Sequence, residues 1–450
     1  MTQRFSKSVL PQAAPGQRRP SPGRPGNRRP ARPGFRVHVQ TLKAPLYWTD
    51  AVMLGTLLLA LAFVIDPFLH LERIAVTKHL PLVIGCFALT MTIVGASLSP
   101  GRDRTRRGSG VARAALPFLL LGTWIIAGSL YARFVDHIND TFLTVGLYML
   151  AAPGIAVFIA ASPGRWRVVG VYMRALSVAA AFMILRMIAE HVTSGGAYHE
   201  LEYLVVPVGV FYALRPHGSG SWNICLAAFF LLGGLTFLKL TGFIALGMAL
   251  AYLWIVDWRF RFRGDMRFRA RAIRCMTVAV LLCAGAAAAI MSRHHKVVPD
   301  GNPGYRLITY QNALHRFFDS PVYGTSFDAS ATSRFTAFEI SAAQGELATH
   351  SDLLDLAANG GLLALGLLLW ANVRVLRYAR QTLFAGGVTD DMVAAAHALA
   401  CMILTGVLVY AFNPILLQPD RALLLWCNTG LLLGMALCHH QGRSLFNLES

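Results

Sequence analysis

Charged residues are scarce in this chain. Only 14% of its 450 residues are Asp, Glu, Lys or Arg, whereas 55% are hydrophobic, and the mean hydropathy is +0.51. A soluble globular chain of this length could not cover its surface with so few charges. The composition therefore predicts an all-α polytopic membrane protein and excludes an ordinary soluble enzyme.

Acidic residues are the scarcer of the two charged types. The 22 Asp and Glu residues are outnumbered by 41 Lys and Arg residues, which gives a formal net charge of +19. The basic residues gather in the N-terminal tail and in a few short loops, as orientation in a membrane requires. Because topology already accounts for these arginines, we expect no nucleic-acid partner.

Cysteine is absent where a metal or disulfide site would need it. None of the seven cysteines lies in the long polar loop at 292–355, and there is no CxxC pair. This pattern excludes a disulfide framework and a thiolate metal site, so we expect no metal and no cofactor. The cysteines are Cys86, Cys225, Cys275, Cys283, Cys401, Cys427 and Cys438.

The first 46 residues lack an apolar core of the length that a cleavable signal peptide needs. They are rich in Pro, Arg and Gly, and such a segment cannot bury enough surface to fold. We expect a disordered basic tail on the cytoplasmic side.

The rest of the chain contains long apolar runs. A helix needs about 20 apolar residues to cross about 30 Å of hydrocarbon. Twelve spans are predicted, nine within 47–291 and three within 356–440, with the polar loop 292–355 between them and a short cytoplasmic tail at 441–450. The spans are expected at 47–69, 80–99, 114–133, 141–161, 169–189, 201–215, 222–238, 240–256, 275–291, 356–373, 392–412 and 421–440.

The loops between these spans alternate in charge. With the N-terminus inside, the inner loops include the basic segments GRDRTRRGSGVAR, SPGRWR and DWRFRFRGDMRFRARAIR, whereas the outer loops are mixed or acidic. The seventh and eighth spans are short, and their FLKLT turn must lie outside for the alternation to hold. The pattern predicts that both termini are cytoplasmic and that the long loop faces outward.

The long loop begins with a helical pattern. Its apolar residues recur at helical spacing between 305 and 318, which predicts an amphipathic helix on the membrane surface that stops at 319–321. The segment 325–345 is small and polar, and we expect it to be mobile. The apolar positions are Leu307, Tyr310, Leu314, Phe317 and Phe318, and the opposite face carries Arg306, Asn312 and Arg316.

The loop ends in the sequence Thr349-His350-Ser351-Asp352 before an apolar run. This matches the capping-box pattern, with Thr349 as N-cap and His350 in the first helical turn. The positive end of the helix dipole disfavours a cationic imidazole there. We therefore expect His350 to be neutral and able to accept a proton.

Several cations accompany this histidine. Arg306, Arg316 and Lys239 could hold a phosphate or pyrophosphate while His350 takes a proton from an attacking hydroxyl. Each of them alone could equally be a surface histidine, a solvated arginine or a snorkelling lysine. Arg186, near Glu190 at the outer end of the fifth span, is either a functional intramembrane charge or part of an interfacial ion pair.

The order of these features resembles the O-antigen ligase and Wzy-type polymerase superfamily. The resemblance rests on YRLITYQNALHRFFDSPVYGTSFD, a variable stretch and THSDLLDLAANGGLLALGLLLW. It implies a GT-C-like architecture in a bacterial inner membrane with one large periplasmic loop. It also implies a metal-independent glycosyltransferase that acts on glycans carried by undecaprenyl pyrophosphate.

The resemblance assigns roles to particular residues. Arg306 matches the loop arginine that contacts the pyrophosphate, and His350 matches the proposed base. In the segment TFLKLTGFIAL, Lys239 stands where family members often have an arginine, and a lysine cannot form the bidentate fork of arginine. Arg316 and Arg186 are expected as further donors. Ser351 stands where an asparagine often follows the histidine.

The whole chain is similar to polymerases of xanthan-type exopolysaccharide clusters. We therefore expect a polysaccharide polymerase that joins lipid-linked repeat units on the periplasmic side, with membrane lipid, a flippase and chain-length or export proteins as partners. An O-antigen ligase that transfers the glycan to lipid A-core is the alternative. A polysaccharide transporter or flippase and a catalytically silent assembly partner are further alternatives.

Overall fold

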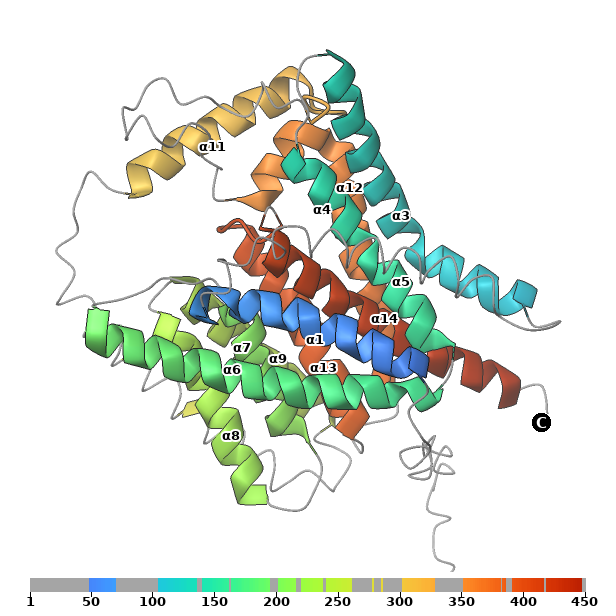
Figure 1. Ribbon diagram of the computed structural model, residues 1–450, viewed down its shortest axis with the longest axis vertical. Coiled ribbons are helices and arrows are strands. Elements are labelled where there is room, and N and C mark those ends of the chain that lie inside the picture. The colour runs from blue at the N-terminus through green and yellow to red at the C-terminus, as the bar shows by residue number, and fades with distance from the viewer. Residues whose placement is uncertain are drawn as a thin grey trace, which may run out of the picture. The chain divides into compact units, whose positions relative to one another are not determined.

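The computed structural model describes residues 48–69, 104–135, 140–161, 163–194, 201–215, 220–237, 240–260, 302–327, 351–381, 383–385, 391–416 and 418–446, with isolated residues at 277, 278 and 285. All regular structure in these ranges is helical, which confirms the all-α class. The helices (Figure 1) are α1 (Trp48–Leu69), α3 (Arg104–Val135), α4 (Asp140–Met149), α5 (Ala151–Ala160), α6 (Trp166–Ser194), α7 (Glu202–Leu214), α8 (Gly220–Gly233), α9 (Leu240–Phe260), α11 (Asn302–Asp319), α12 (Asp352–Gln381), α13 (Asp391–Tyr410) and α14 (Pro419–Phe446), with 3-10 turns η4 (Pro163–Arg165), η5 (Gly234–Phe237) and η8 (Leu383–Ala385).

Within the described residues, six helical segments are long and apolar enough to cross a membrane. They are Arg113–Tyr131, Phe142–Ala160, Trp166–Thr193, Asp352–Gln381, Asp391–Tyr410 and Arg421–Cys438. Shorter apolar helices occupy Trp48–Ala62, Glu202–Leu214, Trp222–Phe237 and Thr241–Val256. The chain is therefore a helical membrane protein. The predicted tail 1–46, the span 80–99 and most of the span 275–291 lie outside the described residues, so the count of twelve stays a prediction.

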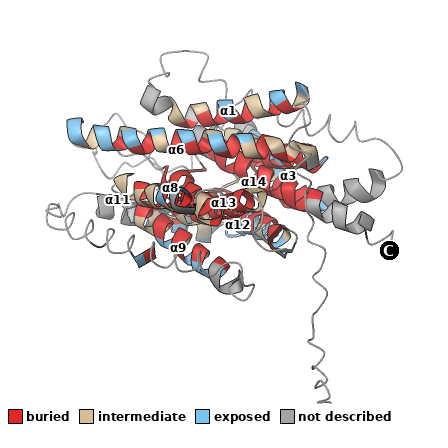
Figure 2. Cartoon of the chain, turned by 90° about the horizontal axis from the view of Figure 1, so that it is seen from below, coloured by how far each residue is buried: buried red, intermediate tan, exposed pale blue. Residues whose placement is uncertain are grey.

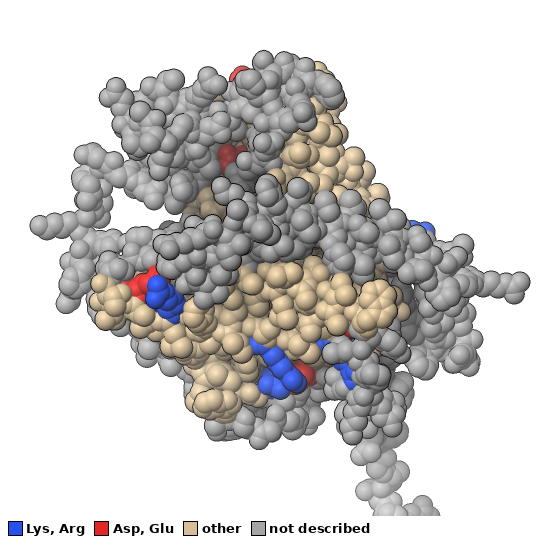
Figure 3. Space-filling view, in the orientation of Figure 1, with Lys and Arg blue, Asp and Glu red and all other residues tan. Residues whose placement is uncertain are grey.

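The side chains of α6 show how a lipid-facing helix is built from this sequence. Val171, Val178, Leu185 and Val192 follow one another at intervals of seven residues, and all four are exposed. Figure 2 shows buried and exposed residues alternating along this helix. The described surface in Figure 3 is mostly uncharged. An exposed apolar stripe of this kind suits hydrocarbon and not water.

Small residues let α5 and α14 approach closely. A Cβ atom added at Gly430 would lie 2.6 Å from the carbonyl oxygen of Ala152, and one at Gly434 would lie 2.9 Å from that of Ala156. Two glycines four residues apart, facing two alanines four residues apart, form the small-residue contact on which membrane helices pack. The sequence alone did not show that these two helices are partners.

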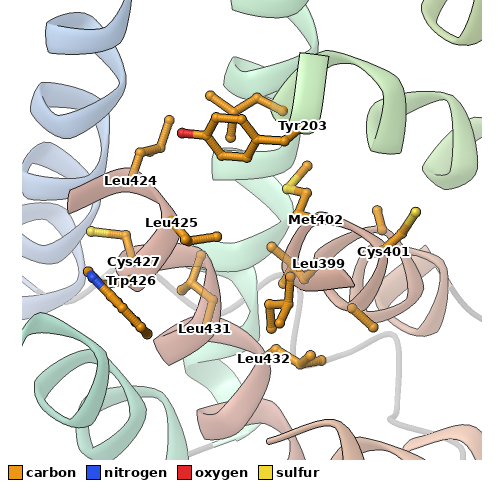
Figure 4. Packing of buried hydrophobic residues seen from close by; sticks show 14 of the residues in the cluster. Tyr203, Leu399, Cys401, Met402, Leu424, Leu425, Trp426, Cys427, Leu431 and Leu432 are labelled. Atoms are coloured by element: carbon orange, nitrogen blue, oxygen red, sulfur yellow. The ribbon is translucent and has the colours of Figure 1, made fainter. Parts of the chain in front are cut away.

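The centre of the bundle is built around α14. Figure 4 shows Trp426, Cys427, Leu431 and Leu432 packed with residues of neighbouring helices, among them Tyr203, Leu399 and Met402. The Tyr172 hydroxyl of α6 donates a hydrogen bond of 2.7 Å to Oδ1 of Asn428. This bond gives the buried carbonyl oxygen of Asn428 a partner, which lowers the cost of burying it, and it links α6 to α14.

Two ion pairs join helix ends that the charge pattern predicts to be cytoplasmic. Nε of Arg165, in η4, lies 3.5 Å from Oδ1 of Asp50 at the start of α1. An amino nitrogen of Arg215, after α7, lies 3.1 Å from Oδ2 of Asp391 at the start of α13. In the twelve-span prediction an even number of crossings separates the partners of each pair, so both contacts are consistent with the predicted alternation.

The helix α12 is not continuous. Gly361 has φ 65° and ψ −168°, so the helix breaks there. The segment 321–327 after α11, which we call the strap, lies against this break. A Cβ atom added at Gly324 would lie 2.4 Å from a backbone atom of Asn359, and one added at Gly361 would lie 2.2 Å from a backbone atom of Val322.

Because residues 325–327 are held in the strap, the prediction that all of 325–345 is mobile was wrong for these three. Residues 328–345 lie outside the described residues.

Candidate functional site

The start of α12 is fixed by Ser351. The Leu354 N–H donates to the Ser351 hydroxyl at 3.4 Å, and the Asp355 N–H donates to the Ser351 carbonyl at 2.9 Å. Ser351 is therefore the N-cap, and the prediction that Thr349 caps the helix with residue 350 in its first turn was wrong. The helix starts at Asp352, two residues later than predicted. Thr349 and His350 themselves lie outside the described residues.

Asp352, in the first turn of α12, holds a distant loop. Its Oδ2 accepts the backbone N–H groups of Ile415 and Leu416, both at 2.6 Å. These residues belong to the loop between α13 and α14. Hydrogen bonds to a carboxylate are about twice as strong as neutral ones. Asp352 is almost fully buried, so it anchors the loop to the start of α12.

Arg316, near the end of α11, faces the same turn of α12. Burial lowers the pKa of its guanidinium, and the negative charge of Asp355 partly opposes this effect. Arginine stays protonated in proteins even so. The predicted site residue Arg316 is therefore a half-buried cation near the acidic start of α12.

The packing of α11 explains this position. Its buried residues Thr309 and Ala313 lie on the face that also carries Arg316, whereas Leu314 and Phe318 are exposed. The helix packs against α12, as Figure 1 shows. The predicted amphipathic helix is confirmed as a helix, with its polar edge toward α12. It includes residue 306, but the Arg306 side chain lies outside those described.

A second buried acid lies at the start of α7. Glu202 is fully buried, and its Oε1 accepts a hydrogen bond from the hydroxyl of Thr241 at the start of α9. Nε2 of His191, near the end of α6, is hydrogen-bonded to the Thr236 carbonyl in η5. The end of η5 and the start of α9 therefore lie at the same end of the bundle as the start of α7 and the end of α6. Lys239, which stands between them in the sequence, lies outside the described residues.

The two acidic helix starts are connected through α14. The Tyr203 hydroxyl donates to the Arg421 carbonyl at 3.1 Å, and the Thr405 hydroxyl of α13 lies 3.3 Å from the Tyr203 carbonyl. Arg421 follows the loop that Asp352 anchors. Arg421 and Glu202 were missed by the sequence reasoning, which noted Asp352 only as part of the capping-box pattern. The only local signal was a charged residue beside an apolar run.

Arg186 is placed differently. Its Nε lies 2.9 Å from Oε1 of Glu190, one turn further along α6, and the Arg186 side chain is 41% exposed. Arg186 thus forms an ion pair with Glu190, as one of the two alternatives from the sequence expected. Partly exposed pairs at this spacing contribute little to stability. The structure therefore brings Arg316 to the acidic start of α12, and gives Arg186 a local partner on α6.

The described part of the chain holds no group of three His, Cys, Asp or Glu side chains arranged for a metal ion. Its polar contacts instead gather helix starts from four regions of the sequence at one end of the bundle. Comparison with known proteins adds no assignment, since no protein-family model matches the sequence and a search of curated proteins finds no significant match.

Proposed function

We propose that the chain is an inner-membrane polysaccharide polymerase that joins glycan repeat units carried by undecaprenyl pyrophosphate. In this proposal the helix starts around Asp352 and Glu202 face the periplasm, and both termini are cytoplasmic. The basic loops predicted on the opposite side support this orientation. The family resemblance of the loop motif supports the substrate class.

The observation that carries the proposal is the fixed start of α12. Ser351 is a buried N-cap, and Asp352 is bound to two backbone N–H groups. His350 therefore directly precedes a rigid point of the fold. Arg316 lies near Asp355, which belongs to the same first turn of α12. The fixed start of α12 supports the proposal, because group transfer from a pyrophosphate requires a proton acceptor and a cation that are held in place.

The chemistry needs few groups. The hydroxyl of the acceptor sugar forms a bond to the anomeric carbon of the donor glycan while the bond from that carbon to the pyrophosphate oxygen breaks. The hydroxyl proton passes to His350, and the electron pair leaves with undecaprenyl pyrophosphate. Arg306, Arg316 and Lys239 stabilise the charge that develops on this leaving group.

The start of α9, two residues beyond Lys239 in the sequence, is held by the hydrogen bond from Thr241 to the buried carboxylate of Glu202. Arg186 is the weakest of the proposed donors, because Glu190 already engages it.

The proposal is tested with His350→Ala, Arg316→Gln and Arg316→Lys in cells that make the polymer. We expect His350→Ala and Arg316→Gln to lower polymer yield at least about tenfold, which is about 1.4 kcal/mol of transition-state stabilisation, and Arg316→Lys to restore part of it. Single repeats should accumulate on the lipid. Matched controls are His315→Ala and Arg380→Gln, whose side chains are exposed.

Other outcomes would separate the alternatives. Full-length polymer from both His350→Ala and Arg316→Gln would contradict the enzyme proposal. Lipid-linked polymer of normal length that never reaches lipid A would indicate a ligase. Lipid-linked repeats retained on the cytoplasmic face would indicate a transporter.

A further inference from the structure

The break in α12 frees backbone groups that a continuous helix would use internally. The strap bonds to them one by one. The N–H groups of Leu362 and Leu363 donate to the carbonyls of Pro321 and Val322 at 2.8 and 3.3 Å. The N–H groups of Thr325 and Phe327 donate to the carbonyls of Ala358 and Asn359, both at 3.0 Å. The indole N–H of Trp124, on α3, donates to the Gly360 carbonyl at 3.3 Å.

This arrangement matches what hydrocarbon demands. The break lies inside the candidate span Asp352–Gln381. A backbone group without a partner is costly in lipid, and irregular backbone is tolerated at that depth only where protein covers it. The bonds made by the strap remove that cost. A break in contact with water would not need such cover.

The side chains of the strap are arranged as in a membrane and not as in a water-exposed loop. Val322 and Tyr323, at its outer side, are 51% and 55% exposed. The polar Thr325 is turned inward, and its hydroxyl donates to Oδ1 of Asn359 at 3.2 Å. Phe327 is fully buried, and its ring centroid lies 5.0 Å from that of Phe142. The strap therefore presents Val322 and Tyr323 outward and turns the hydroxyl of Thr325 inward.

The outward side chains of the strap continue a larger surface. Leu314 and Phe318 of α11 are exposed before it in the sequence, and Leu362 and Leu363 of α12 are exposed after the break. We call these four residues, with Val322 and Tyr323, the apolar edge. Further along α12, the exposed residues Leu369, Trp370 and Val373 continue the apolar surface of the candidate span. The apolar edge thus extends a lipid-facing surface onto a segment outside the regular spans.

We propose that the strap enters the bilayer and that the apolar edge contacts acyl chains of the leaflet nearest the start of α12. Tyr323 suits this position, because an amphipathic ring favours the membrane interface. Trp124 packs beside it, with ring centroids 5.9 Å apart. The strap thereby fixes the end of α11, and with it Arg316, at a set depth. This inference does not depend on the proposed reaction.

The test uses the full chain in liposomes, with its native cysteines replaced by alanine. A fluorescent label is attached to Tyr323→Cys, and quenching is measured with phosphatidylcholine that carries a nitroxide on its acyl chain. Val178→Cys, on the exposed stripe of α6, is the lipid-facing control. Ala161→Cys, in the exposed turn after α5, is the water-facing control.

We expect the label at 323 to be quenched as strongly as at 178 and at least threefold more strongly than at 161. Quenching at 323 no greater than at 161 would overturn the proposal. If Tyr323→Cys fails to fold, Val322→Cys and Phe318→Cys carry the same measurement with the same two outcomes.

Discussion

At the scale of single residues, Asp352 shows how one side chain holds two distant segments of the fold together. It follows the N-cap Ser351 directly, and its carboxylate binds Ile415 and Leu416 from a loop more than sixty positions away. It also lies at the positive end of the helix dipole, where a negative charge is stabilised. One carboxylate thus joins the start of α12 to the connection between α13 and α14.

Replacement of Asp352 by alanine should therefore destabilise the fold. Two buried N–H groups would lose their acceptor, and we expect the free energy of unfolding to fall by about 2–4 kcal/mol. Asp352→Asn keeps one acceptor oxygen and should cost less. Thermal unfolding in detergent measures both variants, with the exposed Asp319→Asn as control. An unchanged midpoint for Asp352→Ala would show that the loop does not depend on this carboxylate.

At the scale of elements, contacts between small residues set which helices pair. The close approach of α5 and α14 requires Gly430 and Gly434, because added side-chain atoms would meet the backbone of α5. The break in α12 depends in the same way on glycine, since Gly361 lies in the left-handed region and faces Val322. At Gly430 and at Gly361 the backbone of one element lies directly against the backbone of another. Any side chain larger than that of glycine would push the two elements apart there.

Gly430→Ala should accordingly lower stability by about 1–3 kcal/mol through overpacking. The control is Gly247→Ala on α9, where a Cβ atom would meet nothing within 4 Å. There alanine should have no cost and can add up to about 1 kcal/mol through its higher helix propensity. Unfolding of both variants with a denaturing detergent measures the difference. Equal stability of the two variants would mean that α5 and α14 do not pack through Gly430.

At the scale of the whole molecule, polar contacts sort the helix ends into two groups. Arg165 with Asp50 and Arg215 with Asp391 join ends that carry the basic loops. Glu202 with Thr241, and Asp352 with the loop before α14, join ends of the other group. We infer that the first group faces the cytoplasm and the second the periplasm, since basic loops are retained inside.

Cysteine labelling in intact cells checks this orientation. Thr193→Cys, at the exposed end of α6, should react with a thiol reagent that cannot cross the inner membrane. Ala161→Cys, in the exposed turn after α5, should react only after permeabilisation. The expected difference in labelling is at least about tenfold, because the bilayer excludes the charged reagent. Labelling of both positions from the same side would contradict a single crossing of the membrane by α6.

The sequence by itself determined the class of the protein and the place of most elements. Long apolar runs predicted the spans at α3, α6, α13 and α14, and helical spacing predicted α11, because both signals lie within one helix. The loop motif also pointed to Arg316, which the structure places beside Asp355.

Only the tertiary structure decided what these elements do for one another. The bond from Thr241 to Glu202 spans 39 positions, and that from Ile415 to Asp352 spans 63. The break at Gly361 and the docked strap depend likewise on partners outside the local pattern. A buried polar group or a bare helix end is stable only beside its partner, and that partner is defined by packing and not by neighbours in the sequence.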